Sequence, residues 1–436
     1  LTANVKDGYS FSGWTGTNSG SETTLKFTVT GNADVTATAD VVTYTISYNA
    51  AGGILKGDYT TSYTVNDVIT LPNPVRDGYD FAGWNYEQDG TGTNNWNTAD
   101  LSATATTVGA GLYGDVILYA TWTAKTYTIT FEADGGAAVA AINYTVESTD
   151  KLPTPSKYGY IPQEWVAVAA EGNWVKDAKY SIGSTVNGKF GNVTLKAVYS
   201  QIPYTLSFNA TGGAVTPTSI IYSIEGNVTY PANGTAVLAT PSRPGYTFGK
   251  WVCTEAWADE NDVLNACDWV VGTEYEAGMS LVGIAGNAKF EATWTANSYD
   301  VAVDDSVATF NGAVGENVVT AGIDYTATVS VPVGYKLAEG IIVKVGTKTA
   351  VYGTDYTYTS DDGFVTATLV IKGNAIVDDI TITPVANIID YTITYIGVNA
   401  GHGFPATYNI ASDEIVIGAP SRSGYRFTGW TGTGID

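Results

Sequence analysis

The chain of 436 residues carries 43 Asp and Glu against 20 Lys and Arg, a net charge of −23 at pH 7. Nucleic-acid binding requires a basic footprint that this composition does not supply, and anionic membrane surfaces repel such a chain. The sequence has no run of eighteen apolar residues and no signal peptide at Leu1. We therefore expect a soluble segment without membrane contact, whose export signal and anchor lie outside residues 1–436.

A motif of the form Gly-Tyr-x-x-x-x-Trp recurs along the chain. It begins at Gly8, Gly78, Gly159, Gly245 and Gly424. A sixth copy, Gly334-Tyr335, has Gly340 where the Trp would stand. Successive motif glycines are 70, 81, 86, 89 and 90 residues apart, a spacing that is too long for a solenoid repeat and indicates small domains in a row. Chains of this kind are typically spacers, binding arrays or polymers.

Other elements recur in a fixed order around the motif. Each full unit opens with a strand in which apolar residues alternate with Thr or Ser, starting at Tyr44, Tyr127, Tyr204 and Tyr391. A glycine pair follows in three units, Gly52-Gly53, Gly135-Gly136 and Gly212-Gly213, and supplies the positive φ of a tight turn. An extended run then ends in a Pro four residues before the motif glycine. An alternating strand, such as Leu118–Trp122, closes the unit.

These residues together resemble the Listeria–Bacteroides repeat, the internalin B-repeat family of bacterial surface proteins. The resemblance implies a mostly β fold (α+β at most) of small β-grasp-like modules in tandem on an extracellular, cell-surface protein. It carries no catalytic residues to transfer. The expected modules are a partial divergent repeat at 1–43, repeats at 44–125, 126–200 and 201–296, a divergent repeat at 297–390 that lacks the Trp, and a partial repeat at 391–436.

The joints between modules are short. Only Thr123–Thr126, Ser200–Pro203 and Thr295–Ser298 separate a closing strand from the next opening strand, and three or four residues cannot act as a loose tether. Modules of this size have a radius of gyration of about 12 Å. We therefore expect an elongated, semi-rigid rod on the order of 150 Å long.

Two cysteines, Cys253 and Cys267, flank an acidic insertion that contains Trp257. A disulfide between them would close a short loop worth about 3 kcal/mol in the chain-entropy model, and exported bacterial proteins favour such bonds. The alternative is a pair of inert thiols. Trp257 lies outside the repeat pattern, and it either packs on its own module or contacts a sugar or protein partner. Trp96, Trp174 and Trp269 each follow a motif Trp within a unit, which predicts core positions.

A basic residue stands two positions before the motif glycine in five units, at Lys6, Arg76, Lys157, Arg243 and Arg422. One interpretation is a row of cations for an acidic ligand or a neighbouring module. The other is a turn residue that lies over nearby aromatic rings, worth about 0.5–1 kcal/mol as a cation–π contact. Pro332 occupies this position in the sixth copy.

Catalysis is disfavoured by the residue inventory. A Ser-His-Asp or Cys-His site would have to use His402, the only histidine, which lies in a Gly-His-Gly turn. We expect no enzyme and no cofactor. Adjacent acids at 259–262, 304–305, 361–362 and 378–379 could bind Ca²⁺ at module joints, but EF-hand and nonapeptide spacings are absent, and solvated loop acids are the alternative.

The sequence favours a non-catalytic stalk or adhesin segment of a bacterial surface protein. Its partners would be a host or neighbouring-cell surface protein or glycan, or copies of itself. One alternative is a filament subunit, because residues 1–43 correspond to the rear of a repeat and 391–436 to the front, so exchange between subunits would polymerise head to tail. Another alternative is a carbohydrate-binding array.

Overall fold

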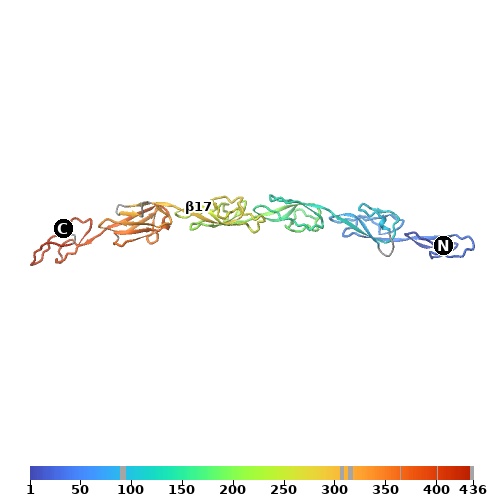
Figure 1. Cartoon of the computed structure of the whole chain (residues 1–436), viewed down its shortest axis with the longest axis horizontal. Helices are drawn as coiled ribbons and strands as arrows, with labels where there is room; N and C mark the ends of the chain where they lie inside the picture. The colour runs from blue at the N-terminus through green and yellow to red at the C-terminus, as the bar shows by residue number, and fades with distance from the viewer. Residues whose placement is uncertain (89–94, 305–308, 313–317, 364, 400, 433–436) are drawn as a thin grey trace. The chain divides into compact units, whose positions relative to one another are not determined.

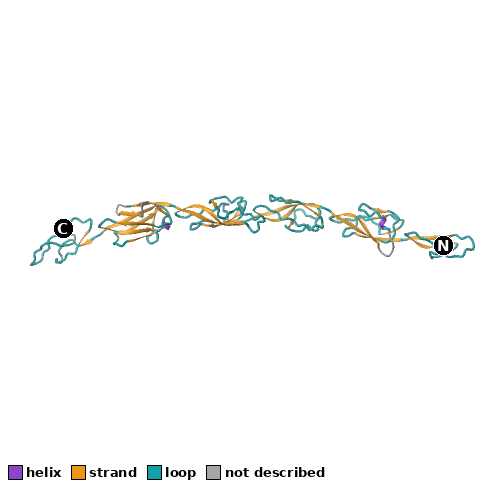
Figure 2. Cartoon of the chain, in the orientation of Figure 1, coloured by secondary structure: helices purple, strands orange, loops and turns teal. Residues whose placement is uncertain are grey.

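The computed structural model describes residues 1–88, 95–304, 309–312, 318–363, 365–399 and 401–432. Figure 2 shows that these residues form strands and loops, with two short 3-10 helices, η1 (Trp96–Thr98) and η2 (Gly373–Ala375). The expected mostly β tandem array is confirmed. No helix in this described part of the chain is long and apolar enough to cross a membrane. The chain divides into an N-terminal unit, Leu1–Ile202 with Asn261–Leu264, and a C-terminal unit, Pro203–Glu260 with Asn265–Asp436.

The three full repeats contain the same mixed sheet. The second strand, opening strand, closing strand and motif strand lie side by side in that order. In repeat 1 (residues 44–125) these are β4 (Ser62–Thr64), β3 (Thr43–Asn49), β8 (Val116–Ala124) and β6 (Tyr79–Gln88), with a separate pair β5 (Ile69–Thr70) and β7 (Thr107–Val108). In repeat 2 (126–200) they are β10 (Ile142–Tyr144), β9 (Tyr127–Glu132), β13 (Val193–Gln201) and β11 (Tyr160–Ala170), extended by β12 (Lys179–Tyr180).

Repeat 3 (201–296) follows the same order in β15 (Ser219–Tyr222), β14 (Tyr204–Asn209), β19 (Asn287–Ala296) and β17 (Tyr246–Trp257), with β16 (Val228–Tyr230) and β18 (Glu274–Tyr275) at the two edges. Figure 1 labels β17, the longest motif strand. Opening and closing strands pair in parallel, while all their other neighbours are antiparallel. This order agrees with the β-grasp-like module expected from the sequence.

An Asp or Asn at the start of each closing strand ties it to the opening strand. The Oδ1 atom of Asp115 accepts the Thr45 N–H at 2.7 Å, and Asn192 and Asn287 accept the Thr128 and Thr205 N–H groups at 3.0 and 2.8 Å. The hydrogen-bonding position lies just before the parallel ladder begins. These side chains therefore help to fix the register of the two central strands.

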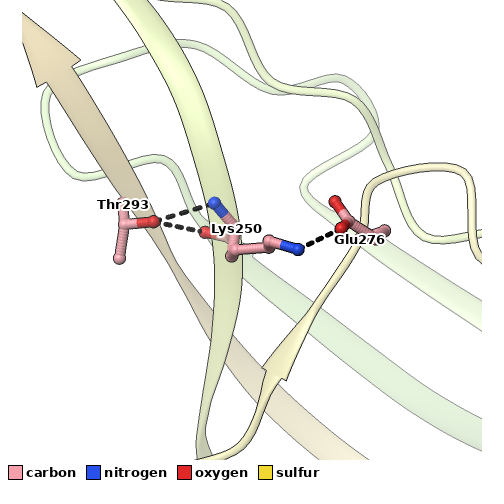
Figure 3. Close-up of polar contacts among 3 residues, drawn as sticks. All are labelled: Lys250, Glu276 and Thr293. Atoms are coloured by element: carbon pink, nitrogen blue, oxygen red, sulfur yellow. Dashed lines mark hydrogen bonds and ion pairs between the residues drawn. The ribbon is translucent and has the colours of Figure 1, made fainter.

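The motif strands of residues 1–43 and of repeats 1 and 3 carry a β-bulge beside the Trp, and a threonine of the neighbouring strand completes the hydrogen bonding there. In repeat 3 the register shifts between Phe248 and Trp251. The Thr293 hydroxyl oxygen accepts the Lys250 N–H at 2.8 Å and donates to the Lys250 carbonyl at 3.0 Å, while Lys250 Nζ pairs with Glu276 (Figure 3). Thr121 donates in the same way to the Gly83 carbonyl. Repeat 2 has the bulge, between Pro162 and Glu164, but Val198 stands in place of the threonine.

The glycine pairs have two different roles. Their first members, Gly52, Gly135 and Gly212, have φ of +82° to +85° and follow a residue that also has positive φ, as a type I′ turn requires. The second members are needed for space. A β carbon on Gly53 would lie 2.5 Å from the Trp122 ring, and one on Gly213 would lie 2.7 Å from the Trp294 ring.

Residues 297–390 keep the repeat sheet and add a second one. The first sheet has the order β22 (Val318–Thr320), β20 (Ser298–Val303), β28 (Ile380–Ile388), β24 (Tyr335–Val345) and β25 (Lys348–Thr349), with β20 and β28 parallel. The second contains β21 (Thr309–Gly312), β23 (Tyr325–Ser330), β27 (Thr366–Ile371) and β26 (Tyr356–Thr359). A β carbon on Gly340 would overlap Tyr358 of this second sheet, so the absence of the motif Trp follows from the added sheet.

The two partial repeats are small. Residues 1–43 pair β1 (Tyr9–Gly16) with β2 (Val35–Val41) and bury Trp14 and Leu25. In residues 391–436 the expected opening strand is reduced to β29 (Tyr391–Thr392), which pairs with β30 (Thr407–Tyr408). No closing strand lies beside β29 in the described residues, and Ile396 and Val416 are exposed.

Candidate functional site

The basic residue before each motif glycine occupies the first position of a tight turn. In all six copies the Tyr N–H donates at 3.1 Å to the carbonyl of the residue three positions earlier, Lys6, Arg76, Lys157, Arg243, Pro332 or Arg422. The motif glycine between them has φ of +76° to +88°, as in a type II turn. The turn brings the side chain of its first residue, the cation, to the same side of the backbone as the side chain of its fourth residue, the motif Tyr.

Four of the five cations lie over the motif Tyr ring. Their charged groups are 3.8 Å (Arg76 over Tyr79), 4.2 Å (Lys157 over Tyr160), 3.7 Å (Arg243 over Tyr246) and 4.4 Å (Arg422 over Tyr425) from the ring centroids. Lys6 is exposed, and no such ring contact is found for it in the described part of the chain. At such partly exposed sites each contact is worth about 0.5–1 kcal/mol.

Two of these cations also reach the glycine-pair turn of their own repeat. Lys157 Nζ donates to the Asp134 carbonyl at 3.2 Å, and Arg243 Nη1 donates to the Thr211 carbonyl at 3.4 Å. The accepting residues are the positive-φ residues of those turns. The cation therefore bridges two turns within one repeat, a geometry that supports a structural role.

The two cysteines of repeat 3 are free thiols in the structure. Cys253 is buried on β17, where its Sγ donates to the Glu255 carbonyl at 3.4 Å. Cys267 packs beside Gly286, at which a β carbon would lie 2.6 Å from the Cys267 Sγ. Burial raises the pKa of both thiols, so neither is activated as a nucleophile. The disulfide stays a prediction.

Trp257 differs from the other additional tryptophans. It ends β17 with 44% of its surface exposed, whereas Trp96, Trp174 and Trp269 are buried. The indole N–H groups of the buried three donate to the hydroxyls of Tyr63, Tyr144 and Tyr222. Each of these tyrosines in turn donates to a glycine carbonyl just before the closing strand. Trp257 is therefore the candidate contact residue for a partner.

The acidic residues mainly hold backbone. Asp379 Oδ1 accepts the Asp300 N–H at 3.0 Å, in the position of Asp115 in repeat 1. Asp362 accepts the Thr366 N–H and the Ser360 hydroxyl, and these hydrogen bonds lower the pKa of its carboxyl. Asp305 lies outside the described residues. Among the residues that are described, no group of three or more His, Cys, Asp or Glu side chains could hold a metal ion.

His402 forms part of a local turn. Its Nδ1 accepts the Phe404 N–H at 3.1 Å, and its ring stacks on Phe404 with the centroids 4.9 Å apart. This arrangement uses the imidazole nitrogen for backbone structure in an exposed loop.

Sequence reasoning missed the buried tyrosines of the second strand. Tyr63, Tyr144 and Tyr222 are each at most 2% exposed, and each precedes a Thr or Ser and then a β-branched residue. This recurring Tyr-Thr/Ser-Val/Ile segment is the signal that could have found them.

Comparison with known families matches residues 44–121, 127–198, 204–269 and 391–433 to the Listeria-Bacteroides repeat domain. Residues 1–40 match the divergent InlB B-repeat domain. The first family alone covers more than half of the chain, and residues 297–390 lie outside both matches. Neither family description is of an enzyme.

Among curated proteins, the chain is similar to a “Putative Gly-rich membrane protein” of Evansella cellulosilytica, with 27% identity over 65% of this chain and 31% of the relative. It is also similar to a “Putative membrane protein” of the same organism (26%, over 61% of the chain and 34% of the relative) and to Internalin H of Listeria monocytogenes (31%, over 32% and 23%). The matches thus span about a third or less of each relative. No solved structure matches the chain.

Proposed function

Because the chain belongs to the Listeria-Bacteroides repeat family, we propose that it is an extracellular, non-catalytic repeat region of a bacterial cell-surface protein. In this role it acts as a semi-rigid stalk or adhesin segment that holds another part of the protein away from the cell. The names of the relatives, two membrane proteins and an internalin, support the surface location.

One recurring hydrogen bond carries the stalk proposal. The first residue after each of five closing strands donates its backbone N–H to the carbonyl of the motif glycine. The donors are Val42 to Gly8, Lys125 to Gly78, Ile202 to Gly159, Asn297 to Gly245 and Ile389 to Gly334, at 2.8 to 3.1 Å. The hydrogen bond fixes the first linker residue to the repeat that precedes it, which supports a stalk with semi-rigid joints.

Partner contact in the adhesin form of the proposal is assigned to Trp257. A half-exposed Trp offers a large apolar face with an N–H at its edge, which suits a sugar ring or a protein surface. The partner would be a host or neighbouring-cell surface protein or glycan, or another copy of the chain. In a plain stalk, Trp257→Ala would leave the adhesion of cells that display the chain unchanged.

The test is the solution shape of residues 1–436, measured by small-angle scattering and negative-stain microscopy across a concentration series. We expect single elongated particles on the order of 150 Å or longer. Compact particles would overturn the stalk proposal. Long fibres at higher concentration would replace it with the filament subunit.

A backbone variant tests the joint itself. Lys125→Pro removes the N–H that donates to Gly78, so we expect a wider spread of bend angles at this joint. Lys125→Ala is the matched control, because it keeps the N–H and loses only the exposed Asp80 ion pair. Equal bend distributions for the two variants would show that this hydrogen bond does not restrain the joint.

A further inference from the structure

The motif glycine faces the repeat that follows it. A β carbon on Gly8 would lie 2.6 Å from the Cβ of Val65, and one on Gly78 would lie 2.9 Å from the Cβ of Val146. In the C-terminal unit, a β carbon on Gly334 would lie 2.8 Å from the Cβ of Ile410. No real β carbon tolerates such distances, so a glycine is required for the next repeat to approach.

The contacted residues occupy one equivalent position. Val65, Val146 and Ile410 each lie in the turn directly after the second strand of their repeat, β4, β10 or β30. At the joint into residues 297–390 the equivalent residue is Ala321, after β22, and a β carbon on Gly245 would lie 3.0 Å from its Cβ. We call these segments the docking turns: 64–67, 145–148, 320–323 and 409–412.

The motif tyrosine adds a polar contact to the same turns. Tyr9 Oη donates to Asn66 Oδ1 at 3.0 Å, and Tyr79 Oη donates to Glu147 Oε1 at 2.8 Å. The second contact raises the pKa of Tyr79, because its proton is held by a carboxylate. Tyr246 contacts the next docking turn at Gly322, where a β carbon would overlap its hydroxyl.

Each docking turn is held rigid by its own repeat. The Thr64 N–H donates to Asp67 Oδ2 at 2.7 Å, and the Thr145 and Asn409 N–H groups donate at 2.9 Å to the hydroxyls of Ser148 and Ser412. In each of these turns the backbone N–H of the fourth residue also donates to the backbone carbonyl of the first residue, which closes the turn. A preformed turn loses little conformational entropy when the preceding repeat contacts it.

Residues 297–390 show which part of the motif this contact needs. This divergent repeat has lost the motif Trp, the preceding cation and the glycine pair. It keeps Gly334-Tyr335, and Gly334 contacts Ile410. The φ of +88° at Gly334 already requires a glycine in this turn, and the contact with Ile410 is a second, independent constraint on the same position.

We propose that the Gly-Tyr motif and the docking turn form a standard interface, at the joints after Gly8, Gly78, Gly245 and Gly334, through which a repeat binds the repeat that follows it. The surface recognises a rigid turn that carries a small or β-branched apolar residue. Where the motif Tyr hydroxyl donates a hydrogen bond, the residue after the apolar one supplies the side-chain acceptor. The interface couples neighbouring repeats. Its biological role rests on the proposed stalk function, whereas its existence does not.

The test compares three glycine-to-alanine variants of the full chain by hydrogen exchange of backbone amides. Gly78→Ala places a β carbon against Val146. Gly57 has φ +78° in the same repeat, and Gly424 has φ +79° in the equivalent motif turn, but a β carbon at either position meets nothing within 4 Å. All three substitutions strain a positive-φ residue, and only the first obstructs a docking turn.

We expect Gly78→Ala to accelerate exchange in the 145–148 turn by at least about tenfold, with repeat 2 otherwise unchanged. Gly57→Ala and Gly424→Ala should leave these amides within about twofold of the parent chain. Tyr79→Phe, which keeps the ring and removes the hydrogen bond to Glu147, should give an intermediate increase. Equal exchange in the Gly78 and Gly57 variants would overturn the interface.

The outcome is independent of the stalk test. If the parent chain is elongated but Gly78→Ala behaves like the controls, the interface fails and the stalk proposal stands. If the parent chain is compact while only Gly78→Ala loosens the joint, the stalk proposal fails and the interface stands.

Discussion

A buried hydrogen-bonded pair of aromatic residues anchors each full repeat at the residue scale. In repeat 1, Tyr63 Oη donates to the Gly114 carbonyl at 2.6 Å and accepts from Trp96 Nε1 at 2.9 Å. The two rings also meet edge to face, with centroids 5.7 Å apart. Both side chains are almost completely buried, so every polar atom of the pair needs its partner. The pair joins the second strand to the start of the closing strand.

Tyr63→Phe should destabilise repeat 1 by about 1–3 kcal/mol, because the Gly114 carbonyl and the Trp96 N–H lose a buried partner. The contribution of Tyr63 to the stability of repeat 1 should depend on pH. Burial raises the pKa of Tyr63 to about 12, above the value of about 10 in an unfolded chain. Stability from the neutral phenol is therefore complete below about pH 10 and falls as the pH rises through about 12.

Urea unfolding followed by tryptophan fluorescence, between pH 8 and the alkaline range, measures both effects. In the parent chain the midpoint of repeat 1 should fall at alkaline pH, and in the Tyr63→Phe chain this fall should be smaller. Tyr59→Phe is the control, since Tyr59 is 39% exposed. A Tyr63→Phe chain as stable as the Tyr59→Phe chain would contradict the role of the pair.

The contrast between these residues and the motif shows what the sequence could predict. Gly-Tyr-x-x-x-x-Trp has a fixed local spacing, so both the repeats and the position of the cation beside the motif Tyr could be read from the sequence. The partner of Trp96 lies 33 residues earlier on another strand. Its identity depends on strand order and register, and these emerge only when the sheet is assembled.

At the scale of elements, the sheet depends on a parallel pair in its centre. Parallel strands are connected by a long crossover and not by a tight turn, so their register needs another source. Asp115 provides one in repeat 1, where its Oδ1 accepts both the N–H and the hydroxyl of Thr45, at 2.7 and 2.9 Å. Asn192, Asn287 and Asp379 accept the equivalent N–H in the other repeats.

Asp115→Ala should lower the stability of repeat 1 by about 1 kcal/mol, the net value of a hydrogen bond that water can partly replace. Exchange at the Thr45 amide should accelerate by about five- to tenfold. Asp115→Asn keeps the accepting oxygen, as the asparagines of repeats 2 and 3 do, and should exchange like the parent chain. If the Asn variant behaved like the Ala variant, the charge of Asp115 would matter and its geometry would not.

Two features at this scale were beyond sequence reasoning. The second sheet of residues 297–390 contains alternating strands such as β23 and β27, but alternation alone does not say which sheet a strand joins. The opening strand expected from Tyr391 to Tyr395 ends at Thr392. Its alternating pattern is the same as in the full repeats, but no closing strand pairs with it among the described residues.

Charge is the property that spans the whole molecule. Five Lys carboxylate pairs are found among the described residues, and every one has a partly exposed lysine. Such surface pairs are worth about 0–1 kcal/mol each. The net charge of −23 produces a repulsion among the acidic residues that opposes the attraction within these pairs. Since repulsion acts over a Debye length, whereas the pairs act at contact, low salt should strengthen mainly the unfavourable contribution.

Raising NaCl from about 20 mM to about 300 mM at pH 7 should therefore raise the Tm of the chain, because the screening length falls from about 20 Å to about 6 Å. Scanning calorimetry measures this directly. The same salt series near pH 4.2, the isoelectric point, is the control, since the net charge there is close to zero and the increase should vanish. A Tm that fell with added salt at pH 7 would mean that the local ion pairs outweigh the repulsion. The same repulsion keeps separate chains apart, so light scattering should detect association only as the pH approaches 4.2.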